Sequence, residues 1–468
     1  MSGFFIEIVR FFASILLSLG LLVSPFAKYT PVEGREYTDE ELKVEPQEGK
    51  YLSLKAVDEG WDIYNPYEGD NFGYRYGPSM ILNADGSIDA YFSAPGTHDE
   101  WDWITYRHSP DGGKTWTEEV SVLEPTGDSP DFYSCCDPGI VKVGDYYYLA
   151  YTSTVQPEGL DNNVFVARSK NPDGPFEKWN GNGWGGARPE PIIEYTGDPT
   201  TYGAGEPSMV VLDGKLYLYY TWRDGPVNQT RVSVADATSE NWPATLEYKG
   251  IGMTHRDGAF DSADVKYIED YGKFIAVVTF ERFTTESCIG VYVSDDGLTF
   301  LESYVTKTNI SHCCHNCGIT GRPNGHIRLS DGVYLAYAYG DKWAYWPTRL
   351  NKVEIGLTDA PDFSDQMNSN VKTAVTFQPK SWYINYIGIV PEKRCYELKV
   401  GEKLNLNIYK ADTSLVTKNL YKDVTLNGFD ESIISANGTK ITAVSVGETF
   451  LTAEWNGHTA EIIVKVTE

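Results

Sequence analysis

An internal repeat constrains the fold of this chain more than any other feature. Each unit holds a short polar motif, an apolar strand, a Gly/Asp turn and an aromatic strand, as in Glu206-Pro-Ser-Met-Val-Val-Leu-Asp-Gly-Lys-Leu-Tyr-Leu-Tyr-Tyr. Successive units start about 60 residues apart. The five units begin at Gly77, Asp137, Glu206, Asp264 and His326. A Gly/Asp turn between two apolar runs predicts a β-hairpin, and a third strand then follows, as at 163–169.

The repeat predicts an all-β fold, a five-bladed β-propeller. Units of three to four antiparallel strands suit this fold, because one meander cannot bury both of its faces whereas five units packed radially can. The alternative is five hairpins in a β-sandwich. In a propeller the first strand of each blade lines the central axis, so the five starting residues would converge on one end of the channel. They are therefore the first candidates for chemistry.

A turn motif supports the propeller. Ser109-Pro-Asp-Gly-Gly-Lys-Thr-Trp116 matches the Asp-box pattern S-x-D-x-G-x-T-W, and Ser294-Asp-Asp-Gly-Leu-Thr-Phe300 is a degenerate version. In such hairpin turns the Ser and Asp side chains cap backbone amides. We expect these turns on the outer rim, where they are structural.

The N-terminus indicates export. Arg10 precedes an apolar run from Phe11 to Val23, and small residues follow at 24–27. A charged start, an apolar run and small residues are typical of a secretory signal. We therefore expect a signal peptide or N-terminal anchor at 1–27, an acidic spacer at 28–50, the propeller at 51–389 and an immunoglobulin-like domain at 390–468. The protein would be secreted or held at the cell surface.

The C-terminal segment has a different pattern of short alternating strands. Asn437-Gly-Thr-Lys-Ile-Thr-Ala-Val-Ser-Val-Gly-Glu-Thr-Phe-Leu-Thr-Ala453 resembles the core of the bacterial immunoglobulin-like group 2 domain, and the resemblance covers almost all of 395–468. It implies a small β-sandwich that serves as a spacer or adhesion unit on exported proteins. We expect cell-surface or cell-wall association through this module, and no active site in it.

Charge and composition bear on the partners. The chain has 66 Asp and Glu against 39 Lys and Arg, a formal net charge of −27. Such an acidic protein repels phosphate backbones and anionic lipid, so neither nucleic acid nor an anionic membrane is an expected partner. Aromatic residues reach 14%, with 33 Tyr and 12 Trp, and such rings suit both β-sheets and sugar-stacking clefts. The expected partner is a carbohydrate substrate.

Seven cysteines include two vicinal pairs, at Cys135-Cys136 and Cys313-Cys314. In an exported protein the first expectation is disulfides that fix loops around the pocket, although an odd count leaves one cysteine over. Two alternatives stay open. One is a soft-metal cluster within Ser311-His-Cys-Cys-His-Asn-Cys317, and the other is free thiols.

Acids open three consecutive repeats. Glycoside hydrolysis needs two carboxyl groups, of which one donates a proton and the other is a base or nucleophile. Clustered acids push their pKa values apart, so that one stays protonated near neutrality. We predict Glu206 as acid/base, Asp137 as its partner, and Asp264 as orienter or base. The alternative for each is a turn cap or a salt-bridge partner.

These segments resemble glycoside hydrolase family 43 over roughly 70–360. Asp137-Pro-Gly-Ile-Val-Lys-Val-Gly-Asp-Tyr-Tyr-Tyr-Leu is similar to the blade opening D-P-S-I-I-x-x-G-x-Y-Y-L, and Ser169-Lys-Asn-Pro-Asp-Gly-Pro-Phe176 is similar to the turn S-x-x-x-x-G-P-F. Gly325-His326 is similar to the fifth-blade motif G-x-G-H. The resemblance implies an extracellular glycosidase acting on a polysaccharide or oligosaccharide, with arabinofuranosides or xylosides favoured. It also implies that His326 holds a central metal ion through water, with calcium as the expected ion.

The chain departs from this family at one catalytic position. The resemblance implies an Asp base, an Asp that orients and a Glu acid on successive blades. By blade count these positions fall on Gly77, Glu206 and Asp264. The base position thus has no acid. Either Asp137, or an acid such as Asp62 or Asp70, would take that role.

Four further residues are predicted to bind substrate, and residues of this kind also suggest two alternative functions for the chain. These residues are Arg75, Trp222, Arg322 and Asp261. Tyr74-Arg75-Tyr-Gly-Pro78 followed by an Asp-box resembles the opening of sialidases, which implies an arginine cluster that grips a carboxylate. Arg223, Arg282 and Arg322 could complete that cluster. The other alternative is a non-catalytic glycan-binding propeller in which Trp101, Trp103, Trp222, Trp343 and Trp346 stack on sugars.

Overall fold

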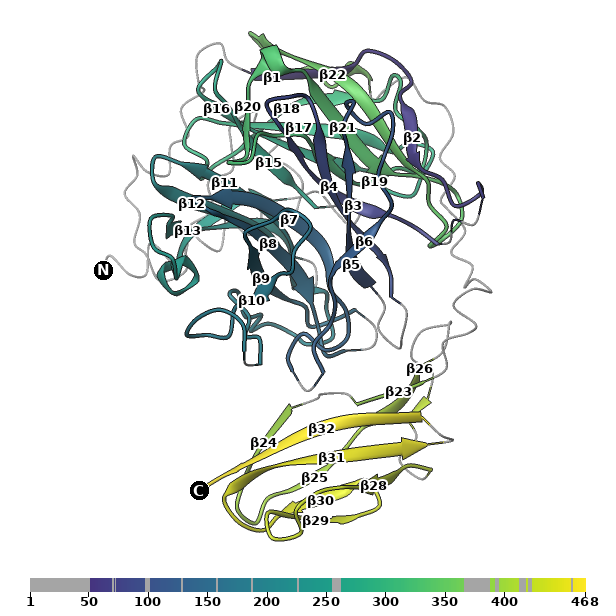
Figure 1. Cartoon of the computed structure of the whole chain (residues 1–468), viewed down its shortest axis with the longest axis vertical. Helices are drawn as coiled ribbons and strands as arrows, with labels where there is room; N and C mark the ends of the chain where they lie inside the picture. The colour runs from purple at the N-terminus through teal and green to yellow at the C-terminus, as the bar shows by residue number, and fades with distance from the viewer. Residues whose placement is uncertain are drawn as a thin grey trace, which may run out of the picture.

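The computed structural model describes residues 51–365, apart from 70, 72, 97–101, 128, 157–158, 187, 225–226 and 255–261. It also describes 388–468, apart from 392–394, 412–417, 420–422 and 456–457 (Figure 1). The predicted signal or anchor, the spacer, Asp70, Trp101 and Asp261 lie outside these residues. Within the described ranges the chain is all β, with two short 3-10 turns at Trp242–Thr245 and Leu329–Asp331. No helix in these ranges has the length and apolarity to cross a membrane.

Residues 51–365 form five sheets of four or five strands. The first is β3 (Tyr76–Leu82), β4 (Ile88–Pro95), β5 (Asp102–Ser109) and β6 (Val120–Leu123). The second is β7 (Cys136–Val143), β8 (Tyr146–Ser153), β9 (Asn163–Ser169) and β10 (Glu177–Lys178). The third is β11 (Gly203–Leu212), β12 (Lys215–Asp224), β13 (Val227–Asp236) and β14 (Glu247–Thr254). The fourth is β15 (Asp264–Ile268), β16 (Lys273–Phe280), β17 (Cys288–Ser294) and β18 (Leu301–Thr306), joined by β20 (His326–Ile327).

The fifth sheet joins the two ends of this region. It holds β19 (His315–Ile319), β21 (Val333–Ala338), β22 (Thr348–Thr358), β1 (Tyr51–Ala56) and β2 (Trp61–Tyr64). β1 pairs antiparallel with β22, from Tyr51 opposite Thr358 to Ala56 opposite Val353, and the two strands lie together in Figure 1. The start of the region is therefore hydrogen-bonded to its end.

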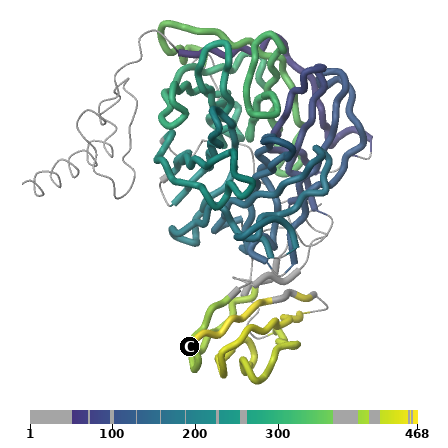
Figure 2. Tube along the Cα trace, turned by 60° about the vertical axis from the view of Figure 1, so that its left-hand side comes forward, coloured from purple at the N-terminus to yellow at the C-terminus, as the bar shows by residue number. Residues whose placement is uncertain are grey.

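The first strands of the five sheets contact one another in a closed cycle. β3 contacts β7, β7 contacts β11, β11 contacts β15, β15 contacts β19, and β19 returns to β3. Figure 2 shows the same region as a thick ring of chain, separate from the C-terminal strands. We call these five strands the inner strands.

Each neighbouring pair of sheets shares one buried apolar cluster. Ile81 of the first sheet packs in one cluster with Leu149 of the second, and Leu82 packs with Ala336 of the fifth. The other three clusters bridge the second and third, third and fourth, and fourth and fifth sheets. Strands with buried residues on both faces explain the near-continuous apolar runs of the repeat, because each sheet is covered on both sides.

The prediction from the repeat was wrong about where the fifth inner strand begins. His326 was expected to open that strand, but the strand is β19, which begins at His315. β20 is only two residues long and pairs in parallel with β15 of the fourth sheet, with His326 opposite Tyr267. The physical reason is the polar loop after Ile319, which carries the chain to the neighbouring sheet before β21 completes the fifth.

The C-terminal region, 388–468, has three sheets of its own. They are built from β23 (Gly388–Pro391), β24 (Cys395–Lys399), β25 (Lys403–Asn405), β26 (Ile408–Ala411), β27 (Lys418–Asn419), β28 (Thr425–Asn427), β29 (Ile434–Asn437), β30 (Lys440–Ala443), β31 (Gly447–Trp455) and β32 (His458–Thr467). Leu406, Ile408, Ile434 and Ile462 are among the residues of one buried core. The immunoglobulin-like assignment stays a prediction.

Candidate active site

Four inner strands open on the same backbone irregularity. The pairing registers of β3, β7, β11 and β19 all shift near the start of the strand. The residue at each shift has a left-handed backbone: Gly77 (φ 61°), Asp137 (φ 50°), Glu206 (φ 53°) and Asn316 (φ 45°). A bulge re-aims a side chain, and the left-handed region costs a residue other than glycine about 1–2 kcal/mol. Backbone strain of this kind concentrates at functional sites.

Hydrogen bonds between inner strands fix how their positions correspond. The N–H of Ile140 donates to Ser79 Oγ at 3.1 Å, and the N–H of Val265 donates to Ser208 Oγ at 2.9 Å. In the same way, the N–H of Ile319 donates to Asp264 Oδ2 at 2.8 Å. Asp264 thus occupies the position of Ser79 and Ser208, two residues beyond the bulge.

This register corrects the sequence alignment of the third acid. Asp264 does not stand where Glu206 stands in its own strand, because that position belongs to Ser262. Asp264 is buried, accepts a hydrogen bond from Ser208 Oγ at 2.8 Å and pairs with Lys266. Its carboxylate therefore ties neighbouring inner strands together.

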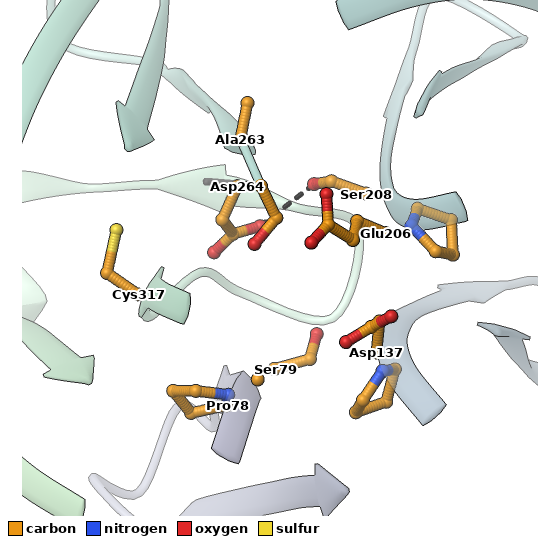
Figure 3. Close-up of a pocket in the computed structure, with 12 residues that line it drawn as sticks. Pro78, Ser79, Asp137, Glu206, Ser208, Ala263, Asp264 and Cys317 are labelled. Atoms are coloured by element: carbon orange, nitrogen blue, oxygen red, sulfur yellow. Dashed lines mark hydrogen bonds between the residues drawn. The ribbon is translucent and has the colours of Figure 1, made fainter. Parts of the chain in front are cut away.

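Asp137 and Glu206 line one cavity of about 200 Å³. A narrower space of about 30 Å³ between the inner strands is lined by both acids and by Asp264, and Figure 3 shows the three carboxylates around it. Thr221 Oγ1 donates to Glu206 Oε2 at 2.6 Å. The predicted acids are therefore brought together: Asp137 and Glu206 line both spaces, and the buried Asp264 lines the narrower one.

The backbone of both bulges is held by the preceding sheet. The N–H of Asp137 donates to Ser93 Oγ at 2.8 Å, and the N–H of Glu206 donates to Thr152 Oγ1 at 2.6 Å. Ser93 and Thr152 each lie on the second strand of that sheet. This repeated bond positions each acid from two elements.

A third acid of this cavity was missed by the sequence analysis. Asp102 begins β5, is buried and lines the cavity. Its carboxylate accepts hydrogen bonds from the hydroxyls of Tyr74 and, at 3.1 Å, Tyr76. Burial raises the pKa of Asp102 to about 7, the Tyr74 hydrogen bond opposes that rise, and the nearby Asp137 adds to it.

Aromatic rings form another part of the cavity wall. Tyr74, Tyr76, Phe283, Trp343 and Trp346 all line it. Their ring centroids lie 6.0 Å apart for Tyr76 and Trp346, 5.3 Å for Phe283 and Trp343, and 4.9 Å for the two tryptophans. Such rings present flat apolar faces, which suit the C–H face of a sugar. Trp343 and Trp346 were flagged as sugar-stacking candidates.

Three of the four predicted substrate-binding residues lie away from the cavity. Arg75 pairs with Glu119 and covers the ring of Tyr64 at 4.5 Å. Arg322 pairs with Asp331, with Nη2 and Oδ2 2.6 Å apart.

Trp222 is buried, with its ring 4.8 Å from that of Tyr195. Asp62, an alternative base, pairs with Arg349 at 2.9 Å and is also absent from the lining. Arg282 is the single arginine among the described lining residues.

His326 does not fit a metal ligand. Its Nε2 lies 2.6 Å from the carbonyl oxygen of Val211 and its Nδ1 lies 3.1 Å from Glu269 Oε1. Both partners accept hydrogen bonds, so both ring nitrogens are engaged. The described residues gather no group of three or more His, Cys, Asp or Glu side chains suited to an ion.

The expectation of disulfides is wrong for six of the seven cysteines. These six are buried, and none of them is in a disulfide: Cys135, Cys136, Cys288, Cys313, Cys314 and Cys317. Cys136 Sγ lies 3.4 Å from Asp137 Oδ2, beside the site. The vicinal pairs do not bridge, because successive side chains near a strand point to opposite faces.

Several solved structures resemble the chain distantly, while no protein-family model and no curated protein matches it. A family 117 glycoside hydrolase produced by the marine bacterium Zobellia galactanivorans is 18% identical, with 72% of this chain and 98% of that chain covered and a TM-score of 0.47. The α-L-arabinofuranosidase from Podospora anserina in complex with cellotriose is 13% identical, covering 67% and 98%, with a TM-score of 0.45. The endo-arabinase from Bacteroides thetaiotaomicron is 14% identical, covering 60% and 95%, with a TM-score of 0.44. Because the likeness is this distant, any argument about the function of the chain comes from its own site residues.

Proposed function

We propose that residues 51–365 form a five-bladed β-propeller that hydrolyses glycosidic bonds. One observation carries the proposal: Asp137 and Glu206 stand on equivalent left-handed bulges of neighbouring inner strands and line one cavity with a wall of aromatic rings. Two carboxyl groups beside a sugar-sized hollow are the minimum that this reaction needs. The aromatic wall supplies binding faces for the sugar.

Glu206 is the proton donor in this proposal. Its bulge aims the carboxyl group into the cavity, and Thr221 holds one of its oxygens. Asp137 is its charged partner, because a neighbouring carboxylate favours the protonated form of an acid. Asp264 acts as the orienter, because it is bonded to Ser208 of the strand that carries Glu206.

The expected substrate is an extracellular polysaccharide or oligosaccharide of arabinofuranoside or xyloside type. The similarity of the repeat openings to family 43 supports this class. A sialidase has less support, because among the described lining residues Arg282 is one arginine where a cluster is needed. A glycan-binding propeller is favoured by Trp343 and Trp346, and it differs from an enzyme in releasing no product.

Sugar release tests the proposal. Wild type and Glu206→Gln would be incubated with arabinans, xylans, galactans and sialylated glycans, and products separated by chromatography. Glu247→Gln is a matched control, because Glu247 pairs with Lys249 on the surface. We expect release by wild type and by the control, and loss of release with retained binding in Glu206→Gln. Binding without release by wild type would favour the glycan-binding alternative.

We also propose export through residues 1–27, with an immunoglobulin-like domain at 390–468 that holds the protein at the cell surface or wall. The apolar run after Arg10 and the group 2 motif at 437–453 support this placement. Cell fractionation of the full chain and of chains lacking either segment tests it. Loss of 1–27 should retain the protein inside the cell, and loss of 390–468 should release it to the medium.

A further inference from the structure

We infer that Asp102 is the general base of the proposed hydrolysis, taking the role for which the first inner strand has no acid. The inference rests on the proposed function and names the second reacting carboxylate of that site. It begins from Gly77, which occupies the bulge position of β3 and brings no side chain to the cavity.

The backbone brings Asp102 to the same place from another strand. Asp102 belongs to β5 of the sheet that contains Gly77. Its carbonyl oxygen accepts a hydrogen bond from the N–H of Cys135 at 2.7 Å. The segment that leads into Cys136 and Asp137 is thereby fixed beside β5, and Asp102 and Asp137 both line the cavity.

The carboxylate of Asp102 retains capacity for a water molecule. Each of its oxygens accepts one tyrosine hydroxyl, from Tyr74 at Oδ1 and from Tyr76 at Oδ2. A carboxylate oxygen has two lone pairs, so each oxygen has a second acceptor position. The two hydroxyls also hold the group rigidly, which proton transfer requires.

The reaction balances with groups already in the site. A water molecule gives one proton to Asp102 while its oxygen bonds to the anomeric carbon. The bond from that carbon to the leaving oxygen breaks, and Glu206 gives its proton to that oxygen. The products are a sugar of inverted configuration and a free alcohol, and the proton on Asp102 returns to Glu206 through solvent.

The charged and titratable neighbours of Asp102 set its pKa, and with it the pH dependence of the proposed activity. Burial raises its pKa most, the Tyr74 hydroxyl lowers it, Asp137 raises it and the Tyr76 hydroxyl lowers it, and together they place it at about 7. Cys136 also faces this group, and burial raises the pKa of its thiol well above the usual range. A base works only when ionised, so activity should rise with pH through about 7.

The test is the pH dependence of kcat for sugar release, in wild type, Asp102→Asn, Tyr76→Phe and Asp89→Asn. Asp89 is a matched control, because it is buried in the same sheet and accepts a tyrosine hydroxyl, that of Tyr106 at 2.6 Å. We expect Asp102→Asn to lower kcat by about 10²–10⁴-fold and to lose the limb near neutrality. Sodium azide should restore turnover of this variant and yield a glycosyl azide, because azide attacks without a base.

Two further outcomes separate the possibilities. Tyr76→Phe should move the rising limb of the pH–kcat profile to higher pH, because it removes a hydrogen bond that stabilises ionised Asp102. This variant tests the base role of Asp102 if Asp102→Asn does not fold. Asp89→Asn should keep the wild-type limb. An Asp102→Asn variant with the wild-type limb and rate would overturn the inference alone, whereas a wild type that releases no sugar would overturn the proposed function itself.

Discussion

Asp137 and Glu206 occupy the same position in neighbouring inner strands, with φ angles of 50° and 53°. Each is followed by a proline, and the backbone N–H of each donates to a hydroxyl on the second strand of the preceding sheet. One local motif, repeated around a shared axis, thus aims two acids at one cavity. The predictions below disturb this arrangement at separate points.

Thr221→Val should lower kcat while leaving the fold intact. The substitution removes the 2.6 Å hydrogen bond to Glu206 Oε2 and keeps the side-chain shape. A lost hydrogen bond of this kind costs about 0.5–3 kcal/mol, so we expect a fall of about 2- to 160-fold. Steady-state kinetics measure it, with Thr221→Ser as the control that keeps the hydroxyl. Equal rates for both variants would show that this bond does not position the acid.

Gly77→Asp should rescue the Asp102→Asn variant. A Cβ at Gly77 would lie 3.6–3.7 Å from Asp137 and Ser93, which is ordinary contact, so a side chain has room. The left-handed backbone costs about 1–2 kcal/mol, less for Asp than for most residues. The double variant should regain sugar release and give a product of inverted configuration. Chromatography measures the release, and NMR measures the configuration. Gly77→Ala in the same background adds no carboxylate and should stay inactive.

Gly139→Ala and Gly318→Ala should destabilise the protein. A Cβ at Gly139 would lie 2.3 Å from the carbonyl oxygen of Pro207, and one at Gly318 would lie 1.9 Å from that of Pro78. Neighbouring inner strands approach so closely there that the backbone must move, at about 1–3 kcal/mol or more. Thermal unfolding measures the loss against Gly183→Ala, where a Cβ meets nothing within 4 Å. Unchanged melting temperatures would contradict the close ring of inner strands.

Trp343→Ala should raise KM more than it lowers kcat. Trp343 lines the cavity at partial exposure, so the variant loses a stacking face without opening the core. Aromatic contacts of this kind contribute about 0.5–1.5 kcal/mol, which corresponds to a 2- to 10-fold change in affinity. Tyr248→Ala, at an exposed ring elsewhere on the surface, serves as the control. A selective loss of kcat would instead place Trp343 in the chemical step.

The sequence predicted the residues whose position follows from the repeat. Asp137 and Glu206 were found because each precedes a proline and an apolar strand, and strands of equal register meet at one end of a ring. Asp264 was misaligned by two residues, because its strand lacks the proline that marks the bulge in β7 and β11. His326 was misplaced because an apolar run cannot say which neighbour a two-residue strand pairs with.

Asp102 could not have been found in this way. It starts the third strand of its sheet, where the repeat has no polar signature, and its link to the site is a hydrogen bond to Cys135 from another sheet. Arg75 looked like a substrate ligand from its neighbours in sequence. Its partner, Glu119, lies 44 residues further on, and no local pattern predicts such a pair.

The pairing of β1 with β22 has a consequence for how the protein folds during synthesis. The strand that leaves the ribosome first in this region must wait for one of the last before the fifth sheet is complete. Contacts so distant in the chain are made slowly. Until then two sheet edges and their apolar faces stay uncovered, which is a hazard for aggregation. On the proposed export route, β1 and β22 can pair only after all of the chain between them has passed the channel.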